Sequence, residues 1–536
     1  MELAPLRGAL PLRDLKVRHV PRFENLFDIV DISSIFKCRI KILVVTDSSS
    51  GGFNNASGFH LGLVLDIVQS DVWPHVVFDF TRAHRQTGDG DIDNFKFDNH
   101  NLGQYDQIWL FGIERFLAPL SGSELKALAQ FMDGGGGMFA TGDHENLGQP
   151  LAAEVPRVRS MRRWYHPNPG PNGEPVAPDQ VGAGRHDTLV DAAGIPSPAG
   201  SQTDEVPQTI RPRYYTAPSL GPIFLKKVRY PHPVLCGPEG AITHLPDHMH
   251  EGHCEEPGDL SQSFTFDGYT TTEYPTLSGH QERPQVIAWA NNNVDNNEFG
   301  VLAAYDGHRS GVGRVVVDAT WHHWFNINLA GFIAATDPAS PSFDPAAVPA
   351  WEEIKSYFRN VGAWLAPEAK QRCLRNGGWL IVLRNTEVLM TLRRAKDHVI
   401  DLGYYFQLGV FARDALGRLA SQCQQRVWLC DIFKVIELDD LVRDPFAPKP
   451  GPMPDPPPFV ESLELENVAL GAAIHSLAER FADEPDVQRL VDDEPDEIDA
   501  AVRRGAADGV VQLFERLQDG TRASRERMSG LNALRK

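Results

Sequence analysis

The sequence predicts an α/β protein: a doubly wound, mostly parallel sheet with a large loop-rich insertion, followed by a mainly helical C-terminal region. The first observation is a series of short apolar runs that alternate with helical patterns before residue 149, as in sheets covered by helices on both faces. The second is a stretch over 149–284 that is rich in Pro, Gly, Asn and His and has little periodicity. The third is a helical spacing of apolar residues from Trp351 onward.

Each element follows from its local pattern. The run at 41–46 (KILVVT) is apolar throughout and bounded by turn residues, which is typical of a strand buried on both faces. A helix is predicted next over 61–68, where apolar residues recur at spacings of three and four. Another helix begins after Ser121 with a capping box, because Glu124 stands three residues later. Further strands are predicted at 75–80, 107–111, 138–141, 286–290, 300–304 and 314–318.

The same patterns divide the chain into five parts. These are a polar lead-in at 1–38, an α/β domain at 39–336 with its insertion at 149–284, a mainly helical region at 350–443, a proline-rich linker at 444–459 and a small helical module at 460–536. An apolar run at 379–383 is expected to interrupt the helical region. We expect residues 350–536 to offer a surface for a protein partner or for self-association.

Composition and charge narrow the classes of function. The formal net charge of −20 argues against nucleic acid and against an anionic membrane surface as partners, because both are bound through clustered Lys and Arg. No apolar run is long enough for a membrane-spanning helix, and the start lacks the pattern of a signal peptide. Six cysteines in 536 residues do not make a disulfide framework. The expectation is a cytoplasmic protein with free thiols.

The strongest catalytic candidates follow the strand at 138–141. Ligands of parallel sheets bind at the carboxyl ends of strands, and Asp143, His144 and Glu145 stand directly after this one. A sharp turn there would present their side chains above the sheet. The alternative is that Asp143 caps a following helix and His144 packs in the core.

A second candidate is the stretch 244–256, which holds four of the 19 histidines within 13 residues. The predicted metal ligands in it are Asp247, His248, His250 and His253. Imidazole together with carboxylate suits a divalent transition metal such as Zn, Mn, Fe or Ni. The alternative is an exposed polar loop that binds no metal.

The third candidate follows the strand at 314–318, where His322 and His323 are the candidate catalytic residues. Adjacent residues alternate faces, so at most one of them is expected to face the site. Asp47, Ser48, Asn54 and Arg162 are candidates for substrate binding. The loop after the first strand matches neither the GxGxxG nor the Walker pattern, so no nucleotide cofactor is expected.

These motifs resemble a known superfamily. The pieces KILVVTD, YDQIWLFG, GGGGMFATGDHE, PQVIAW and GVGRVVVDATWHHW are similar to segments of the class I glutamine-amidotransferase-like superfamily, in its trehalose-utilisation (ThuA-like) branch. The resemblance is carried by residues 40–144 and 284–324. It implies a flavodoxin-like doubly wound sheet for residues up to about 336, and no family is recognised for residues 350–536.

The resemblance also bears on activity. It implies a nucleophilic cysteine on the turn after the strand at 138–141, but this sequence has Gly142 and Asp143 there and no cysteine. Glutaminase activity is therefore not expected. His322 or His323 matches the position of the superfamily's catalytic histidine. The trehalose-utilisation branch similarly lacks the cysteine and is associated with sugar metabolism, which implies a carbohydrate ligand.

Two main hypotheses of function remain. The first is an enzyme, a hydrolase or isomerase, that acts on a polar small molecule by metal-assisted or His/carboxylate acid–base chemistry. The second is a non-catalytic ligand-binding or assembly scaffold whose helical part binds a partner. A third is a residual amidotransferase that uses Cys236 or Cys254. The discriminating observation is whether the three histidine-bearing segments meet in one place.

Overall fold

The structure is a computed structural model of the chain. It describes residues 37–48, 51–70, 73, 75–164, 185–189, 206–220, 225–237, 240–246, 250–395, 400–436, 442, 444–446, 462–481 and 486–534. The predicted lead-in at 1–38 and the linker at 444–459 lie almost entirely outside these residues.

The centre of the molecule is a parallel sheet. Its parallel strands run in the order β2 (Val76–His84), β1 (Cys38–Thr46), β3 (Gln107–Phe111), β4 (Gly137–Thr141) and β20 (Val315–Asp318). This is the order of flavodoxin-like sheets, in which the chain reverses direction across the sheet between the first and third strands. The predicted mostly parallel α/β fold is therefore confirmed.

The sheet continues beyond β20 with further strands, some from the insertion at 149–284 and some from the chain that follows it. Strand β19 (Glu298–Tyr305) pairs antiparallel with β20, and β13 (His253–Cys254) and β5 (Arg162–Arg163) extend the sheet beyond it. Strand β18 (Gln285–Asn291) also pairs with β19, and β7 (Arg211–Pro212) pairs with β18. The insertion thus folds onto the sheet edge, where its strand β13, which holds His253, lies beside β19.

The remaining strands of the insertion form small antiparallel pairs. These are β6 (Pro207–Thr209) with β12 (His244–Pro246), β8 (Tyr214–Leu220) with β9 (Leu225–Pro231), β10 (Cys236–Gly237) with β11 (Gly240–Ala241), β14 (Ser263–Phe266) with β15 (Tyr269–Thr272), and β16 (Thr276–Leu277) with β17 (His280–Gln281). Each pair is short, which explains why this part of the sequence lacks periodicity.

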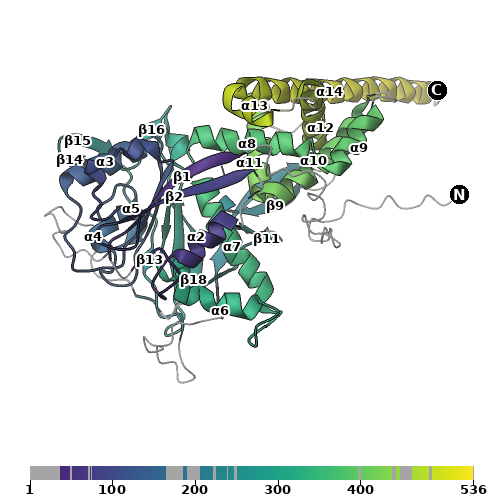
Figure 1. Ribbon diagram of the computed structural model, residues 1–536. Coiled ribbons are helices and arrows are strands. Elements are labelled where there is room, and N and C mark those ends of the chain that lie inside the picture. The colour runs from purple at the N-terminus through teal and green to yellow at the C-terminus, as the bar shows by residue number, and fades with distance from the viewer. Residues whose placement is uncertain are drawn as a thin grey trace.

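Helices cover the sheet on both faces (Figure 1). Helices α2 (Gly62–Ser70), α6 (Asn326–Thr336) and α7 (Ala347–Trp364) pack together on one side, while α3 (Gly122–Asp133) lies on the other. The short helices α4 (Gln149–Ala152) and α5 (Val158–Met161) follow β4. The predicted capping box of α3 is present, because the Ser121 side chain accepts from the Glu124 N–H and the Glu124 carboxylate accepts from the Ser121 N–H.

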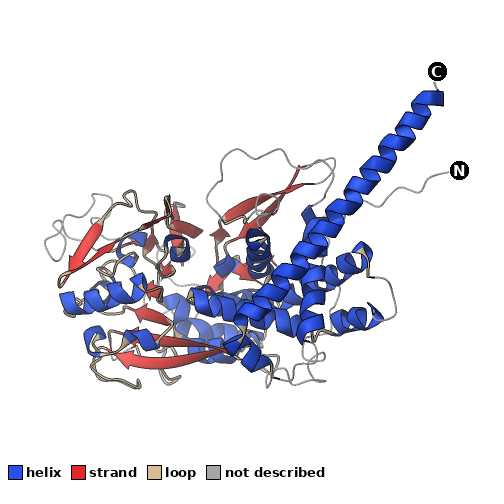
Figure 2. Cartoon of the chain, turned by 90° about the horizontal axis from the view of Figure 1, so that it is seen from above, coloured by secondary structure: helices blue, strands red, loops and turns tan. Residues whose placement is uncertain are grey.

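The C-terminal region is helical, as predicted. It comprises α7, α8 (Glu368–Val382), α9 (Thr386–Ala395), α10 (Leu402–Ala420), α11 (Gln422–Val435), α12 (Ser462–Phe481), α13 (Val487–Asp493) and α14 (Pro495–Leu534). Helix α12 packs against both α10 and α14, and in Figure 2 the far part of α14 extends away from the rest of the described chain. The apolar run at 379–383 continues α8 and does not interrupt the helices, because its side chains are buried in the helical core. Across the described residues, none of the helices has the length and apolar character to cross a bilayer.

One cysteine pair overturns the expectation of free thiols. Cys38, at the start of β1, is joined to Cys373 of α8 by a disulfide across 335 residues of sequence. Cys236, Cys254, Cys423 and Cys430 are free and buried. Sequence spacing could not reveal the pair, because only the packing of α8 beside β1 brings the two sulfurs together.

Breaking this disulfide is expected to destabilise the protein. Replacing Cys373 by alanine should lower the free energy of unfolding by about 2–5 kcal/mol, because the link constrains a long loop of the unfolded chain. Thermal unfolding with and without a phosphine reductant checks this. The wild type should lose stability on reduction, whereas the variant should not respond. A reductant-insensitive wild type would contradict the disulfide.

Candidate metal centre

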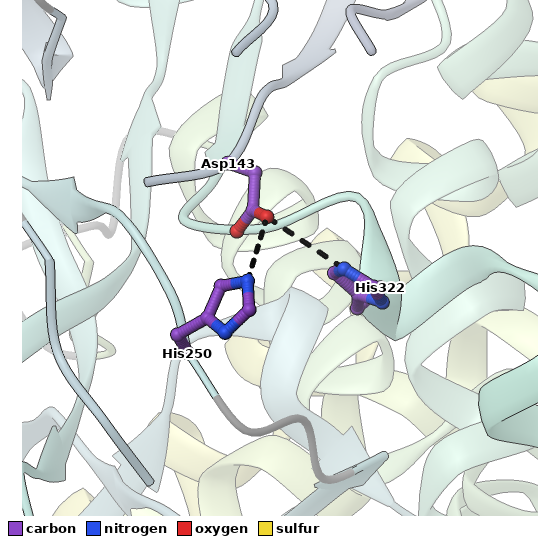
Figure 3. A group of neighbouring side chains, drawn as sticks. All are labelled: Asp143, His250 and His322. Carbon is purple, nitrogen blue, oxygen red and sulfur yellow. Dashed lines mark ion pairs between the residues drawn. The ribbon is translucent and has the colours of Figure 1, made fainter. Parts of the chain in front are cut away.

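Three segments that are far apart in sequence meet at the carboxyl edge of the sheet (Figure 3). Asp143 follows β4, His322 begins the 3₁₀ helix η8 (His322–Trp324) after β20, and His250 precedes β13. The Oδ2 atom of Asp143 lies 3.7 Å from Nε2 of His250 and 3.6 Å from Nε2 of His322. One potential ligand atom from each residue lies within 4.8 Å of the other two, so the group could hold a metal ion. The histidine-bearing segments therefore do meet.

Strand register explains why Asp143 and His322 converge. Strands β4 and β20 are adjacent and parallel, with Thr141 opposite Asp318, so the loops that follow them leave the sheet side by side. The turn after β4 needs a glycine at 142, because a Cβ there would lie 2.6 Å from the carbonyl oxygen of Leu147. The loop after β4 therefore folds tightly back on itself, and the N–H of Asp143 donates to the carbonyl oxygen of Leu147 at 3.1 Å.

Thr320 orients the carboxylate. Its hydroxyl donates to Oδ1 of Asp143 at 3.1 Å and accepts from the backbone N–H of His322, also at 3.1 Å. Its own N–H donates to Oδ1 of Asp318 at 3.2 Å. Thr320 therefore leaves Oδ2 of Asp143 as the oxygen that faces the two imidazoles. Thr320 was not identified from the sequence, although this residue lies in the DATWHH segment that holds His322 and His323.

Asn328 fixes the orientation of His322. Its Oδ1 lies 3.1 Å from Nδ1 of His322, and since an amide oxygen only accepts, Nδ1 carries the hydrogen and Nε2 keeps its lone pair. The ring also stacks on Trp321, with 3.5 Å between ring centroids. A ligating histidine is usually held in this way by a partner on its other nitrogen. Asn328 lies on α6, six residues on, and no sequence pattern pointed to it.

Burial keeps both imidazoles neutral. It lowers the pKa of His322 to about 3 and that of His250 to about 4, although the nearby carboxylate of Asp143 acts in the opposite direction. Neutral imidazole is the form that ligates metals. Separations of 3.6 and 3.7 Å are slightly wider than the roughly 3.3 Å between ligand atoms of a tetrahedral Zn²⁺ site. The donor set could therefore hold a metal ion.

His144 and Glu145, which follow Asp143 in the predicted catalytic motif, lie in different surroundings. His144 lies beside the group, with Nδ1 3.0 Å from Oδ2 of Asp143 and its ring centroid 4.0 Å from that of His250. Glu145 is exposed and lies 3.7 Å from the guanidinium of Arg115. His144 is thus close enough to exchange a proton with a group at the centre, whereas Glu145 pairs with Arg115.

His323 belongs to a separate buried network. Its Nδ1 lies 2.8 Å from Asp318, and its Nε2 lies 3.1 Å from Gln208 and 3.8 Å from Glu251. Burial acts to lower the pKa of His323, but the carboxylates of Asp318 and Glu251 outweigh it and raise the pKa to about 10. His323 is therefore protonated and committed to these carboxylates, so of the predicted pair only His322 faces the site.

The four predicted metal ligands are not found together in one group. His250 belongs to the group, while Asp247 and His248 lie outside the described residues. His253 is in β13, where its Nδ1 lies 2.9 Å from Nε2 of His186 and its Nε2 lies 3.8 Å from Glu255. The described contacts of His253 therefore place it in a different cluster.

The predicted substrate-binding residues support loops at the same edge. Oδ1 of Asp47 accepts from the N–H groups of Ile113 and Glu114, and Ser48 donates to Glu114 at 2.7 Å. Asn54 hydrogen-bonds to Asp89. Arg162 is buried and donates to the carbonyl oxygens of Asp143 and Ala319, so it positions the two loops of the site. A substrate role for these four residues stays a prediction.

Asp47 is expected to make stability depend on pH. Burial raises its pKa to about 7, although the N–H groups of Ile113 and Glu114 act to lower it. The unfolded chain ionises near pH 4, so the stability from protonated Asp47 is complete below about pH 4 and is lost as pH rises through about 7. Asp47→Asn keeps the accepting oxygen and cannot ionise. It should be more stable than the wild type at pH 8, by about 2–4 kcal/mol.

Urea unfolding at pH 5 and pH 8 tests this difference. The gap between variant and wild type should be small at pH 5 and widen at pH 8. The exposed residue Asp79, paired with Arg39, gives a control variant, Asp79→Asn, whose gap should not widen. Parallel pH profiles for Asp47→Asn and the wild type would show that Asp47 is ionised throughout.

The two cysteines of the amidotransferase alternative have other partners. Sγ of Cys254 donates to the carbonyl oxygens of Val301 at 3.2 Å and Val317 at 3.5 Å, and burial raises its pKa well above the usual range for a thiol. Sγ of Cys236 accepts from the N–H of Cys423 at 3.3 Å. Among the contacts of the described residues, neither sulfur meets His322 or His323.

Fold and site together define an α/β protein with a buried two-histidine, one-carboxylate group at the carboxyl edge of a flavodoxin-like sheet. Comparisons of the chain with family models, with curated proteins and with solved structures found no match. The function must therefore be inferred from the chemistry of the group itself.

Proposed function

We propose that the protein is a metal-dependent hydrolase that binds a divalent transition metal at Asp143, His250 and His322 and acts on a polar small molecule. The observation that carries the proposal is the convergence of two neutral imidazoles and a buried carboxylate from three separate segments. Two histidines with one carboxylate are the protein ligands of several catalytic zinc and iron sites, which leave positions open for water or substrate.

The residues around the group have distinct roles in this proposal. Asp143, His250 and His322 hold the ion, Thr320 and Asn328 orient two of these ligands, and His144 carries a proton to or from the reacting group. A metal at this position would polarise a substrate carbonyl or lower the pKa of a bound water. The buried ion pair of protonated His323 and the Asp318 carboxylate holds the loop after β20 in place.

The resemblance to the amidotransferase-like superfamily adds a proposal about the substrate. The trehalose-utilisation branch has sugar-related chemistry and, like this chain, lacks the cysteine after the fourth strand. It supports a carbohydrate or a similar polyhydroxylated small molecule as the substrate class. Isomerisation of such a molecule would use the same acid–base groups.

Metal analysis and an activity screen test the proposal together. Mass spectrometry of the purified protein should find about one equivalent of Zn, Mn, Fe or Ni per chain, which a chelator removes. Hydrolysis of a panel of sugar esters, lactones and amides should be lost with the metal and restored by adding it back. If the protein neither retains nor takes up any of these metals, the proposal fails and the scaffold hypothesis comes first.

A further inference from the structure

A backbone bridge aligns part of the insertion with His250. His186 and Glu251 form an isolated antiparallel bridge, with N–H to O distances of 3.0 Å and 2.8 Å in the two directions. In this register Asp187 stands opposite His250, and Arg185 stands opposite Gly252. Residues directly opposite each other in an antiparallel pair share one face.

The contacts of Glu251 and His186 show which face of the bridge points toward the metal group. Glu251 lies 3.8 Å from His323, and His186 stacks on Phe299 with ring centroids 4.0 Å apart, so both point away from the metal group. His250 points to Asp143. Since side chains alternate along an extended segment, Arg185 and Asp187 lie on the face of His250.

Arg185 is held in place without being buried. Its Nε and Nη2 donate to Oδ1 of Asp187 at 3.1 Å and 2.8 Å, and 40% of its side chain stays exposed, against 15% for Asp187. The residue opposite is glycine, and a Cβ on Gly252 would lie 2.2 Å from Nη2 of Arg162. No side chain from that position therefore covers Arg185.

Arg185 keeps its positive charge in acidic surroundings. Its hydrogen bonds to Asp187 and the charges of Glu145 and Asp143 raise its pKa, which also shows that the guanidinium lies near the carboxylate of the metal group. Arg115, 3.7 Å from Glu145, offsets part of this negative charge. A half-exposed ion pair such as that of Arg185 and Asp187 contributes little to stability. A guanidinium has five N–H donors, and two of them are used on Asp187.

We propose that Arg185 is a specificity-determining residue that binds an oxyanion of the substrate, a carboxylate or a phosphate, beside the metal group. Asp187 fixes the guanidinium so that its remaining donors are presented to the oxyanion in a planar fork. The inference rests on the proposed function, because the oxyanion would belong to the molecule on which the metal centre acts. It narrows the substrate to an acidic polar molecule, such as a sugar acid or a sugar phosphate.

Equilibrium dialysis with labelled inorganic phosphate and labelled acetate tests the proposal on the full chain. Each anion is measured with the metal-loaded and the metal-free protein, for the wild type, for Arg185→Gln and for Arg211→Gln. Arg211 is a matched control, because it pairs with Glu298 in the same two-donor way and is also exposed. Metal content is measured separately on every sample.

For the wild type we expect one of the two anions to bind, and that anion identifies the oxyanion class. Arg185→Gln should weaken its binding about tenfold or more, as expected for losing a hydrogen bond to a charged group, with unchanged metal content. Arg211→Gln should bind like the wild type. Equal binding by wild type and Arg185→Gln, or no binding of either anion, overturns the inference.

The two proposals can fail separately. Binding that depends on Arg185 in a protein that takes up no metal would support the anion site and refute the metal-dependent function. A metal-loaded protein whose anion binding ignores Arg185 would support the function and refute the anion site.

Discussion

Replacing His322 by alanine is expected to lower the affinity for a divalent metal at least about 100-fold while leaving the fold in place. Losing a residue that only supports a ligand costs about 10- to 100-fold, so losing a ligand should cost more. His322 is neutral and lies at the end of a loop, so its removal leaves no uncompensated charge in the core. Competition with a chromophoric chelator measures the affinity, and circular dichroism checks the fold.

The sharpest control is another histidine that sequence alone ranked as a ligand. His253→Ala should keep wild-type metal affinity, because His253 contacts His186 and Glu255 outside the group. Asn328→Ala should fall between the two, with a loss of about 10- to 100-fold, because it frees the ring of His322 without removing it. If His253→Ala loses as much affinity as His322→Ala, the ligand set proposed here is wrong.

The sequence predicts the buried strands well and the edge strand less well. The prediction at 107–111 coincides with β3, which lies between two neighbours and is apolar on both faces. Strand β2 continues to His84, four residues beyond the predicted end at 80, although that part is polar. It is the edge strand, and its backbone pairing with β1 rather than an apolar pattern defines its length.

The residues of the site also fall into those that the sequence predicts and those that it does not. Asp143 and His322 were predictable because both directly follow strands, and parallel strands bring their carboxyl ends together. The composition of 244–256 predicted metal ligands at Asp247, His248, His250 and His253 but could not tell which of them reaches Asp143. That choice depends on where the insertion pairs with β19 and β5, which local sequence does not encode. Thr320 was missed because its hydroxyl contacts Asp143, 177 residues away in sequence. Asn328 was missed because its contact with His322 depends on the turn between η8 and α6, which spacing alone does not predict.

The carboxylate of Asp318 is expected to matter more for stability than any other single group near the site. Its Oδ1 accepts from Nδ1 of His323 at 2.8 Å, and its Oδ2 accepts from Trp324 at 2.9 Å and from Tyr357 at 2.7 Å. All of these groups are buried. Asp318→Asn should lower the free energy of unfolding by about 3–5 kcal/mol, because it leaves the protonated His323 without its nearest carboxylate and turns an amide N–H₂ toward donors.

Denaturant unfolding of a double-mutant cycle isolates the charge pair. His323→Gln removes the positive charge, so Asp318→Asn should cost about 1–3 kcal/mol less in that background than in the wild type. Asp337, an exposed residue whose side chain accepts from the N–H of Ala339 at the end of α6, gives the control variant Asp337→Asn, which should change stability by about 1 kcal/mol or less. Additive effects of the two buried substitutions would mean that His323 is neutral. His323 would then be available for proton transfer. The roles of His322 as the residue at the metal centre and of His323 as a structural residue would have to be exchanged, or both residues would act at the site.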